Sequence, residues 1–262
     1  MAKKQQKNRL ASSSISSFTE TILSISRRFS ISQVFEDFLT LTIAACTQNP
    51  ALRISYYETE YLETIRKYKD LDLRHKFPKA LACLIEEVEA RNESSLGNDV
   101  LGEFFEEHIS NGRNGQFFTP YPVCQMMAAM VASTPPENSN EPLRILDPTC
   151  GSGRMLLAAR CVGTGQREYY GIDIDQTCVK MAAVNLFFNG MWNSEVMCAN
   201  VLDPNDFVLS YHISLLPLGI FKIQDKGKSA IWHLFQRGLE KIKKDKDFKK
   251  VANEKGSQLK LF

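Results

Sequence analysis

The first half of the chain repeats its hydrophobic residues at helical spacing. Between residues 31 and 110, apolar side chains return every three or four positions, which is typical of helices that bury one face. Gly97 and Asn98 interrupt the pattern before a last short helix. The sequence therefore predicts a helical domain over residues 31–110. Its apolar positions include Val34, Phe38, Leu41, Ile43, Tyr61, Ile65, Tyr68, Leu81, Leu84, Ile85, Val88, Leu101, Phe104 and Phe105.

Residues 10–30 carry a weaker version of the same pattern. This stretch is rich in serine, and its apolar residues Leu10, Ile15, Phe18, Ile22 and Ile25 are spaced near three or four. It is either a loose helix or disordered. We therefore expect residues 1–30 to form a flexible, basic and serine-rich segment.

Beyond residue 115 the pattern changes to strands that alternate with helices. Short apolar runs at 144–146, 168–172 and 195–199 are predicted strands, and the segments 155–161 and 176–188 between them are predicted helices. Such alternation predicts a parallel, doubly wound sheet. The fold class is therefore α/β, with a Rossmann-like domain over residues 111–223 that follows the helical domain.

The end of the chain leaves little room for a complete sheet. Only 62 residues follow Asn200, too few for the second half of a typical doubly wound sheet together with a target-recognition domain, so the sheet could be truncated. Segments 212–216 and 220–223 could supply one or two further strands. Residues 224–262 are predicted as an amphipathic helix and a basic tail. The helix carries Ile231, Leu234, Phe235, Leu239 and Ile242.

Composition and charge narrow the class of protein. The chain has 44% hydrophobic residues, 24% charged residues and no apolar run long enough for a membrane span or a signal peptide, so we expect a cytoplasmic protein. Seven scattered cysteines without C-x-x-C spacing indicate neither a disulfide framework nor a zinc site. Residues 1–30 and 222–262 are basic and the middle of the chain is acidic, which suits either DNA contact or solubilising tails.

The candidate binding site is a glycine loop after the first predicted strand. The run Asp147-Pro148-Thr149-Cys150-Gly151-Ser152-Gly153 ends a strand at a carboxylate and turns into a helix. Glycines let backbone N–H groups and a helix N-terminus approach a small ligand. The dinucleotide fingerprint G-x-G-x-x-G fits only in part because Leu156 takes the third glycine position. Structural glycines in a turn without a ligand are the alternative.

An acid at the end of the second strand adds to this site. Asp173 follows Gly151 by 22 positions, close to the offset at which a carboxylate meets the hydroxyls of a ribose. Asp175 precedes a helix and is expected to be its N-cap.

Together these segments resemble a known family. Gly115 to Pro120, the loop at Asp147, and Gly171 to Asp175 are similar in order to motifs X, I and II of the gamma-type DNA adenine-N6 methyltransferases. More narrowly, they resemble modification subunits of type I restriction-modification systems, which carry a helical domain first. The resemblance covers residues 31 to about 203. It implies S-adenosyl-L-methionine as cofactor, bound by the domain over residues 111–223, and DNA as partner.

The resemblance also implies roles for individual residues. The segment against the methionine end of the cofactor is matched by Phe117, Thr119 and Pro120. The loop around its amino-acid moiety is matched by Asp147, Gly151 and Gly153. Asp173 matches the acid on the ribose, Ile174 the apolar residue on the adenine ring, and Asn200 a position that is commonly Asp and contacts the adenine amino group. The asparagine carbonyl can accept the same hydrogen bond.

Plainer interpretations of the same residues stay open. Phe117 could belong to the core, Thr119 could cap the helix that Pro120 begins, and Asn200 could hold a turn.

The family's base-holding motif is missing. Transfer to an exocyclic amine requires an extruded base, stacked on an aromatic ring, whose amine donates hydrogen bonds to the enzyme. In the family this is the work of Asn/Asp-Pro-Pro-Tyr/Phe, but the only Pro-Pro pair here is Pro135-Pro136, upstream of the glycine loop. Catalytic residues therefore remain unassigned.

Several functions stay in competition. The first is a DNA adenine-N6 methyltransferase that is completed by a partner, such as a restriction-modification specificity subunit, or by a longer reading frame. The second is a catalytically inactive cofactor-binding module that interacts with DNA or restriction-modification proteins. A class I methyltransferase acting on RNA, protein or a small molecule ranks third, and NAD-dependent oxidoreduction last. Residues 258–262 also resemble a peptide that docks on the DNA sliding clamp, with a plain terminus as the alternative.

Overall fold

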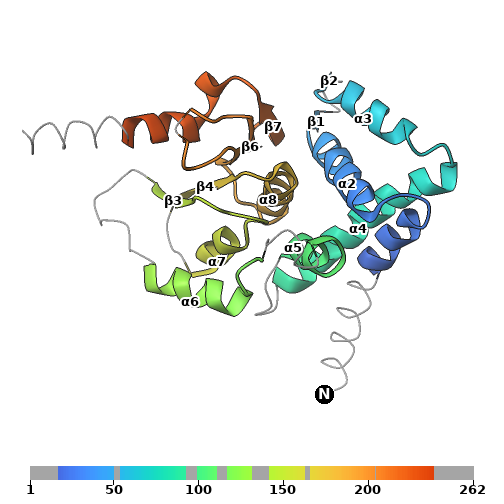
Figure 1. Ribbon diagram of the computed structural model, residues 1–262, viewed down its shortest axis with the longest axis horizontal. Coiled ribbons are helices and arrows are strands. Elements are labelled where there is room, and N and C mark those ends of the chain that lie inside the picture. The colour runs from blue at the N-terminus through green and yellow to red at the C-terminus, as the bar shows by residue number, and fades with distance from the viewer. Residues whose placement is uncertain are drawn as a thin grey trace, which may run out of the picture.

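The computed structural model describes residues 17–49, 54–92, 99–110, 117–131, 142–162, 166–203 and 205–238. Gly115, Gln116 and the segment 258–262 lie outside these ranges. The described chain has a helical part beside an α/β part, with the helices of residues 17–110 on one side of the sheet (Figure 1). This arrangement confirms the predicted α/β fold preceded by helices.

The helical part consists of short helices that pack around aromatic residues. Its elements are α2 (Ile31–Cys46), α3 (Glu58–Arg66), α4 (Leu71–Asn92), α5 (Val100–Phe105), the π-helical turn η1 (Glu106–Ser110) and the two-residue strands β1 (Gln48–Asn49) and β2 (Ile54–Ser55). A helix also spans Ser17–Ser26, and its residues Phe18, Ile22 and Ile25 are fully buried. Residues 17–26 are therefore a packed helix, which corrects the prediction of a flexible segment for that stretch.

The α/β part is built on a five-stranded mixed sheet. Strands β3 (Leu143–Asp147), β4 (Arg167–Asp173), β5 (Ser194–Cys198), β6 (Leu209–Leu215) and β7 (Leu218–Ile223) lie in this order across it. The first three are parallel, as predicted, whereas β6 and β7 form an antiparallel hairpin beside β5. The two strands of the hairpin are joined by a short turn, which forces the antiparallel direction. Among the described strands, none pairs with the outer edge of β3.

Helices cover both faces of this sheet. Helices α7 (Arg154–Val162) and α8 (Gln176–Phe188) pack on one face, and α6 (Tyr121–Val131) packs on α7. On the other face, Ile231 and Leu234 of the helix over residues 230–238 pack against Tyr170, Ile172 and Met197 of the strands. The bounds of α8 agree with the prediction, and Asp175 caps it as expected by accepting a hydrogen bond from the Thr177 N–H.

The helical part is joined to the sheet by apolar and polar contacts. Buried residues of both parts form one continuous hydrophobic cluster. The Nζ of Lys180 on α8 donates hydrogen bonds to Glu36 and Thr40 of α2, at 3.2 and 3.1 Å. At the edge of β7, the Thr47 hydroxyl and the Tyr57 hydroxyl bond the backbone of the strand. This edge of the sheet is thus covered.

No single described helix combines the length and apolar character that crossing a membrane requires. The helices Ser17–Ser26 and Ile31–Cys46 meet both requirements only when taken together, and they are bent by 117° relative to each other. Most apolar residues of that pair are buried in the core just described.

Candidate functional site

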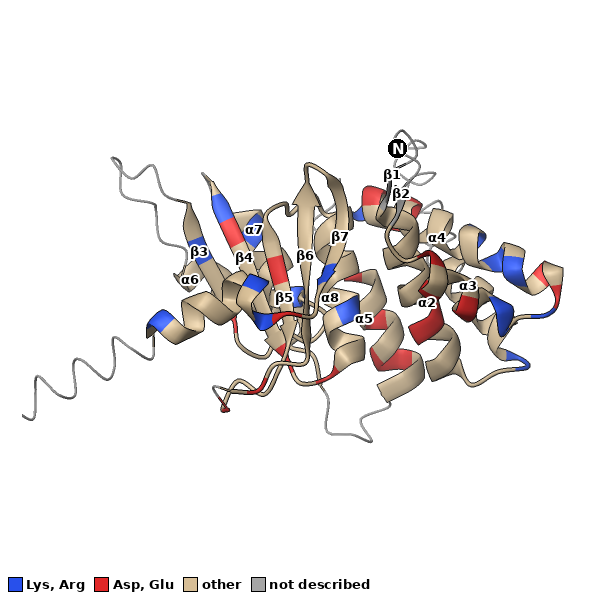
Figure 2. Cartoon of the chain, turned by 90° about the horizontal axis from the view of Figure 1, so that it is seen from above, with Lys and Arg blue, Asp and Glu red and all other residues tan. Residues whose placement is uncertain are grey.

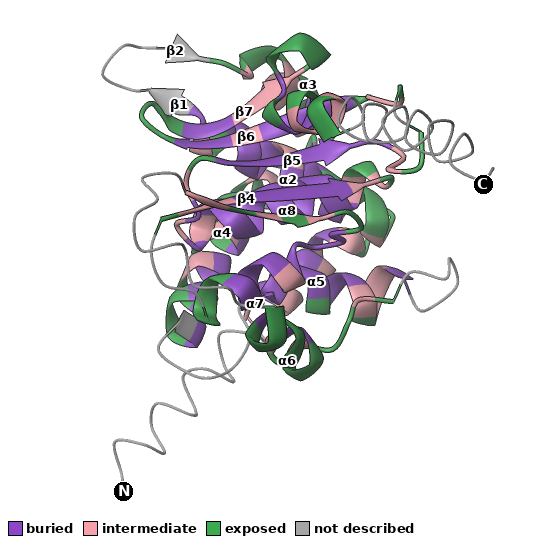
Figure 3. Cartoon of the chain, turned by 90° about the vertical axis from the view of Figure 1, so that its left-hand side faces the viewer, coloured by how far each residue is buried: buried purple, intermediate pink, exposed green. Residues whose placement is uncertain are grey.

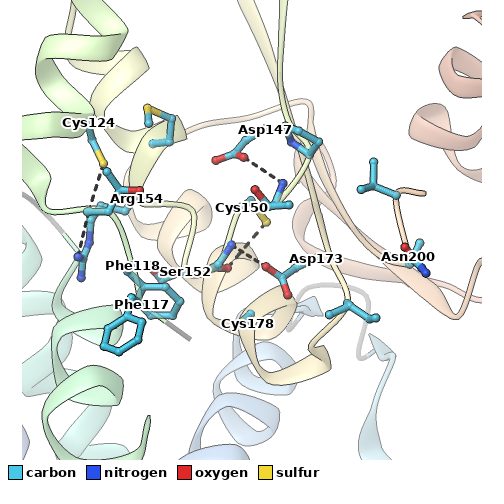
Figure 4. Close-up of a pocket in the computed structure, with 18 of the residues that line it drawn as sticks. Phe117, Phe118, Cys124, Asp147, Cys150, Ser152, Arg154, Asp173, Cys178 and Asn200 are labelled. Atoms are coloured by element: carbon cyan, nitrogen blue, oxygen red, sulfur yellow. Dashed lines mark hydrogen bonds between the residues drawn. The ribbon is translucent and has the colours of Figure 1, made fainter. Parts of the chain in front are cut away.

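A cavity of about 620 Å³ opens beyond the carboxyl ends of the three parallel strands. Asp147 ends β3, Asp173 ends β4, and Asn200 follows β5 by two residues. Figure 4 shows Phe117, Phe118 and Arg154 on one side of this cavity and Asn200 on the other, with Asp147 and Asp173 between them. Ligands of open α/β sheets bind at this position, outside the carboxyl ends of the strands.

The glycine loop is fixed by hydrogen bonds from its own backbone. The Cys150 N–H donates to the Ile172 carbonyl of β4, and the Gly153 N–H donates to the Cys150 carbonyl, both at 2.8 Å. Gly151 adopts a φ of 53°, which favours glycine, and its N–H donates to the Asp173 carboxylate at 2.8 Å. A Cβ on Gly151 would lie 2.7 Å from the Phe118 ring. The loop therefore requires glycine here on two grounds.

Two carboxylates give the cavity an acidic character. One oxygen of Asp173 accepts from Gly151 and the other from the Asp175 N–H, so this side chain is held in place. Burial and the nearby charge of Asp173 raise the pKa of Asp147, although a hydrogen bond from the Thr149 N–H opposes this change. Further acidic residues, drawn in red in Figure 2, lie in the loops at this end of the sheet. The arrangement favours a cationic ligand.

Exposed apolar side chains form a rim around the acidic centre. Phe117 is 78% exposed, Ile174 72% and Leu202 89%, and all three border the cavity. Such flat or branched apolar surfaces can pack on an aromatic ring. Burial raises the pKa of the Cys150 and Cys178 thiols that also border the cavity, so they stay protonated and are poor nucleophiles.

The structure brings together most of the residues predicted for the site. Those that border the cavity are Phe117, Thr119, Asp147, Gly151, Asp173, Ile174 and Asn200. Gly153 does not, because a Cβ there would face Ala182 of α8 at 3.3 Å. Pro120 also lies off the cavity, and its carbonyl accepts from Val123 and Cys124 in the first turn of α6. Asn200 combines both interpretations: it borders the cavity, and its side-chain oxygen accepts from the Leu202 N–H at 3.0 Å.

Sequence reasoning missed a buried polar cluster beneath the glycine loop. Its centre is Asp99, which is 1% exposed and caps α5 by accepting from the Gly102 N–H at 2.9 Å. The same carboxylate accepts from Ser152 Oγ at 2.5 Å, Arg154 Nε at 2.7 Å and Asn185 Nδ2 at 2.8 Å. The cluster thus joins α5 of the helical part to the glycine loop and to α8.

The missed residues leave only weak signals in the sequence. Asp99 precedes a short apolar run and could be identified as an N-cap. Asn185 is a polar residue on an otherwise apolar helix, where a buried amide must find partners. Neither signal indicates that the partner lies more than fifty residues away.

The chain is similar to known methyltransferases over this part. Residues 97–210 match the N-6 DNA methylase family. The type II restriction enzyme and methyltransferase RM.BcgI of Heyndrickxia coagulans is 26% identical over 141 residues, which are 47% of this chain and 21% of that protein. The chain thus spans about a fifth of the length of the curated relative it matches.

Two solved structures are similar to this chain over part of their length. A class I S-adenosylmethionine-dependent methyltransferase assigned in Listeria monocytogenes gives a TM-score of 0.42 at 14% identity, covering 75% of this chain and 55% of that one. The methyltransferase subunit of a type I restriction-modification system from Streptococcus thermophilus gives 0.34 at 15% identity, covering 72% and 58%. The segment that matches the N-6 DNA methylase family, residues 97–210, includes the glycine loop, the three parallel strands and Asn200 of the cavity.

Proposed function

We propose that the cavity binds S-adenosylmethionine and that the chain is the cofactor-binding part of a DNA adenine-N6 methyltransferase of restriction-modification type. The observation that carries this proposal is the convergence of Asp147, Asp173 and Asn200 from three parallel strands on one cavity of about 620 Å³. Each side chain offers hydrogen-bond acceptors, as the ammonium, ribose and adenine amine of the cofactor require.

The charges of the cavity fit this cofactor. S-adenosylmethionine carries positive charge on its sulfonium and its ammonium, and both would lie near Asp147 and Asp173. The Coulomb energy of two opposite charges about 4 Å apart is large in a partly buried site. A dinucleotide would instead bring a negatively charged pyrophosphate to the same carboxylates, which disfavours the NAD alternative.

The remaining predicted residues have a place in the same arrangement. The exposed side chains of Ile174 and Leu202 border the same cavity as Asn200, where they can pack on the adenine ring. Phe117 lies on the side of the cavity away from Asn200, and Thr119, two residues further along the chain, also borders the cavity, so this side suits the methionine end. The cofactor supplies an electrophilic methyl group, while these residues bind and orient it. Gly153 shapes the loop through its packing on α8 rather than by contact.

The family match favours DNA adenine as the substrate, but the base must be held by other residues. The full sequence has no Asn/Asp-Pro-Pro-Tyr/Phe segment. We therefore propose that methyl transfer needs a second polypeptide or a further segment, with a restriction-modification specificity subunit as a partner that directs the enzyme to its DNA site.

Calorimetric titration of the purified chain with S-adenosylmethionine tests cofactor binding. We expect saturable binding, and a flat titration would contradict the proposal. Incubation with tritiated cofactor and mixed-sequence duplex DNA then tests transfer. Label on adenine supports the enzyme, whereas binding without label, with or without candidate partners, supports an inactive cofactor-binding module.

The sliding-clamp peptide at residues 258–262 stays a separate prediction. Pull-down of purified clamp by the full chain and by a chain lacking these residues tests it, and equal recovery of clamp would end the idea.

A further inference from the structure

Arg154 borders the cofactor cavity, but each of its three nitrogens already donates a hydrogen bond to a partner within the protein. Its Nε donates to Asp99 at 2.7 Å, and one terminal nitrogen donates to Glu106 at 2.8 Å. The other terminal nitrogen donates to the Thr119 carbonyl at 3.2 Å. Burial alone would lower the pKa of Arg154, but the charges of Asp99 and Glu106 outweigh it and keep the guanidinium charged.

Glu106 extends this contact to the wall of the cavity. One of its carboxylate oxygens accepts from Arg154, and the other accepts from the Phe118 N–H at 2.9 Å. Arg154 and Glu106 thus hold the backbone on both sides of the Phe118–Thr119 peptide. Glu106 itself does not border the cavity.

The Phe118 ring is packed between Phe105, Arg154 and the glycine loop. It stacks on Phe105 of α5 with centroids 5.8 Å apart, and the Arg154 guanidinium carbon lies 5.5 Å from its centroid. On its other side the ring fills the space that a Cβ on Gly151 would take. A shift of the Phe118 backbone would therefore move the ring against the glycine loop.

We infer that Arg154 and Glu106 are positioning residues that set the Phe117–Thr119 wall of the cofactor cavity, and that Arg154 is not the receptor for the carboxylate of the cofactor. The inference rests on the proposed binding of S-adenosylmethionine. Two carboxylates already surround the guanidinium, so a third would meet net repulsion there. Glu106 comes from η1, and the helical part of the chain therefore shapes the cofactor site.

The two possible roles of Arg154 predict opposite effects of Glu106→Gln. If Arg154 bound the cofactor carboxylate, removal of the competing Glu106 charge would leave affinity unchanged or raise it. If the pair positions the wall, affinity falls, because glutamine has a single acceptor oxygen and must give up either Arg154 or Phe118. We expect the Kd for S-adenosylhomocysteine to rise about tenfold, the effect of one charge-assisted hydrogen bond.

Four further variants sharpen the test. Arg154→Lys keeps the charge but not the planar fork that reaches three partners, so we expect it to weaken binding as much as Arg154→Gln. The double variant Glu106→Gln with Arg154→Gln should bind no more weakly than Arg154→Gln alone, because both changes break one chain of contacts. Arg144→Gln is the matched control, since Arg144 pairs with Glu168 at 3.0 Å at the opposite ends of β3 and β4. It should leave the Kd unchanged.

Hydrogen exchange of the ligand-free protein tests the positioning role of the pair without any ligand. We expect the Phe118 amide to exchange at least fivefold faster in Glu106→Gln than in the wild type, and at the wild-type rate in Arg144→Gln. Unchanged exchange and an unchanged or lower Kd for Glu106→Gln would overturn the inference. If the wild type binds no cofactor, the proposed function fails, and the exchange rates still show whether the pair positions the wall.

Discussion

The floor and the rim of the cavity are built in opposite ways. Beneath the glycine loop, Asp99, Ser152 and Asn185 are buried and hydrogen-bonded to one another. Around the opening, Phe117, Ile174 and Leu202 expose most of their apolar surface. A polar network in a dry place fixes one geometry, because every misplaced group would lose its partner. Exposed apolar groups stabilise a complex when a ligand or another surface covers them, because apolar surface is then removed from water. The floor is therefore preorganised, and the rim gains free energy on contact.

The same contrast continues outside the cavity. Most of α6 is exposed, as the green colour of that helix in Figure 3 shows, and only Cys124 and Ala128 of α6 are buried. Its exposed residues include Val123, Met126, Met127, Met130 and Val131, which are all apolar. Of the two sheet edges, β7 is covered by Thr47 and Tyr57, while no described strand pairs with the outer edge of β3. The covered edge is the one that meets the helical part, and the uncovered edge is the one farthest from it in the strand order.

The largest expected effect comes from the centre of the floor. Asp99→Ala removes the acceptor of Ser152, Arg154 and Asn185 and the cap of α5. Loss of one partner of a buried charge pair costs about 3 kcal/mol of unfolding free energy. We expect this loss in denaturant unfolding, together with loss of cofactor binding in the fraction that stays folded.

A buried aspartate far from the cavity provides the control. Asp37 accepts from Lys67 at 2.7 Å and from Tyr68 at 2.8 Å within the helical part. Asp37→Ala should also destabilise the protein, yet the folded fraction should bind the cofactor normally at low temperature. Equal losses of affinity in both variants would show that Asp99 acts through general stability only.

The next effect separates the two glycines of the loop. Gly151→Ala forces a methyl group into the Phe118 ring at a φ of 53°, and we expect about 2 kcal/mol of destabilisation and a weaker Kd. Gly153→Ala also has a positive φ but faces α8, so it should lower stability with little change in Kd. Thermal unfolding and calorimetry measure the two quantities. A Kd that rises equally in both would contradict the assignment of Gly153 to packing.

Features encoded in neighbouring residues could be predicted from the sequence. The bounds of α8, the cap at Asp175 and the strand–loop–helix around Gly151 follow from local spacing and turn chemistry. Asp147 and Asp173 could be paired because parallel strands end at one edge of a sheet. The apolar spacing of Phe18, Ile22 and Ile25 was also a correct helix signal, although serine-rich composition favoured disorder.

Features that depend on distant contacts could not be predicted. Asp99 and Arg154 are 55 positions apart, and nothing in their local sequence shows that one neutralises the other. The exposure of Phe117 and the partial burial of the adjacent Phe118 are also set by tertiary packing, since either ring suits the core by composition. The antiparallel pairing of β6 with β5 is also a tertiary feature, because the apolar pattern of a strand does not show the direction of its partner.

A smaller effect of opposite sign is expected at Asp147. Its pKa is raised by burial first and also by the charge of Asp173, so the ionised form destabilises the ligand-free fold. A raised pKa contributes stability below the unfolded value of about 4, which is lost as the pH rises through the folded value. Asp147→Asn keeps an acceptor for Thr149 and should raise the Tm by roughly 2 °C at pH 7.

The gain in Tm should vanish near pH 3, where both proteins carry a neutral group. Cofactor affinity should fall in the same variant, because the amide no longer attracts the ammonium. Asp203→Asn, a change outside the cavity, serves as the charge-matched control. A lower Tm for Asp147→Asn would contradict this prediction and would show that the ionised carboxylate stabilises the loop.

The smallest effect on stability is expected on α6. Met130 is 78% exposed, so Met130→Gln should change the unfolding free energy by no more than about 0.5 kcal/mol. Ala128→Gln on the same helix places a polar side chain at a buried position and should cost about 2 kcal/mol or more. Binding of a hydrophobic fluorescent dye should fall in Met130→Gln because less apolar surface is exposed. If Met130→Gln instead destabilised the chain as strongly as Ala128→Gln, Met130 would have to be covered in solution. The contrast between the hydrogen-bonded floor of the cavity and an exposed apolar surface would then not extend to α6.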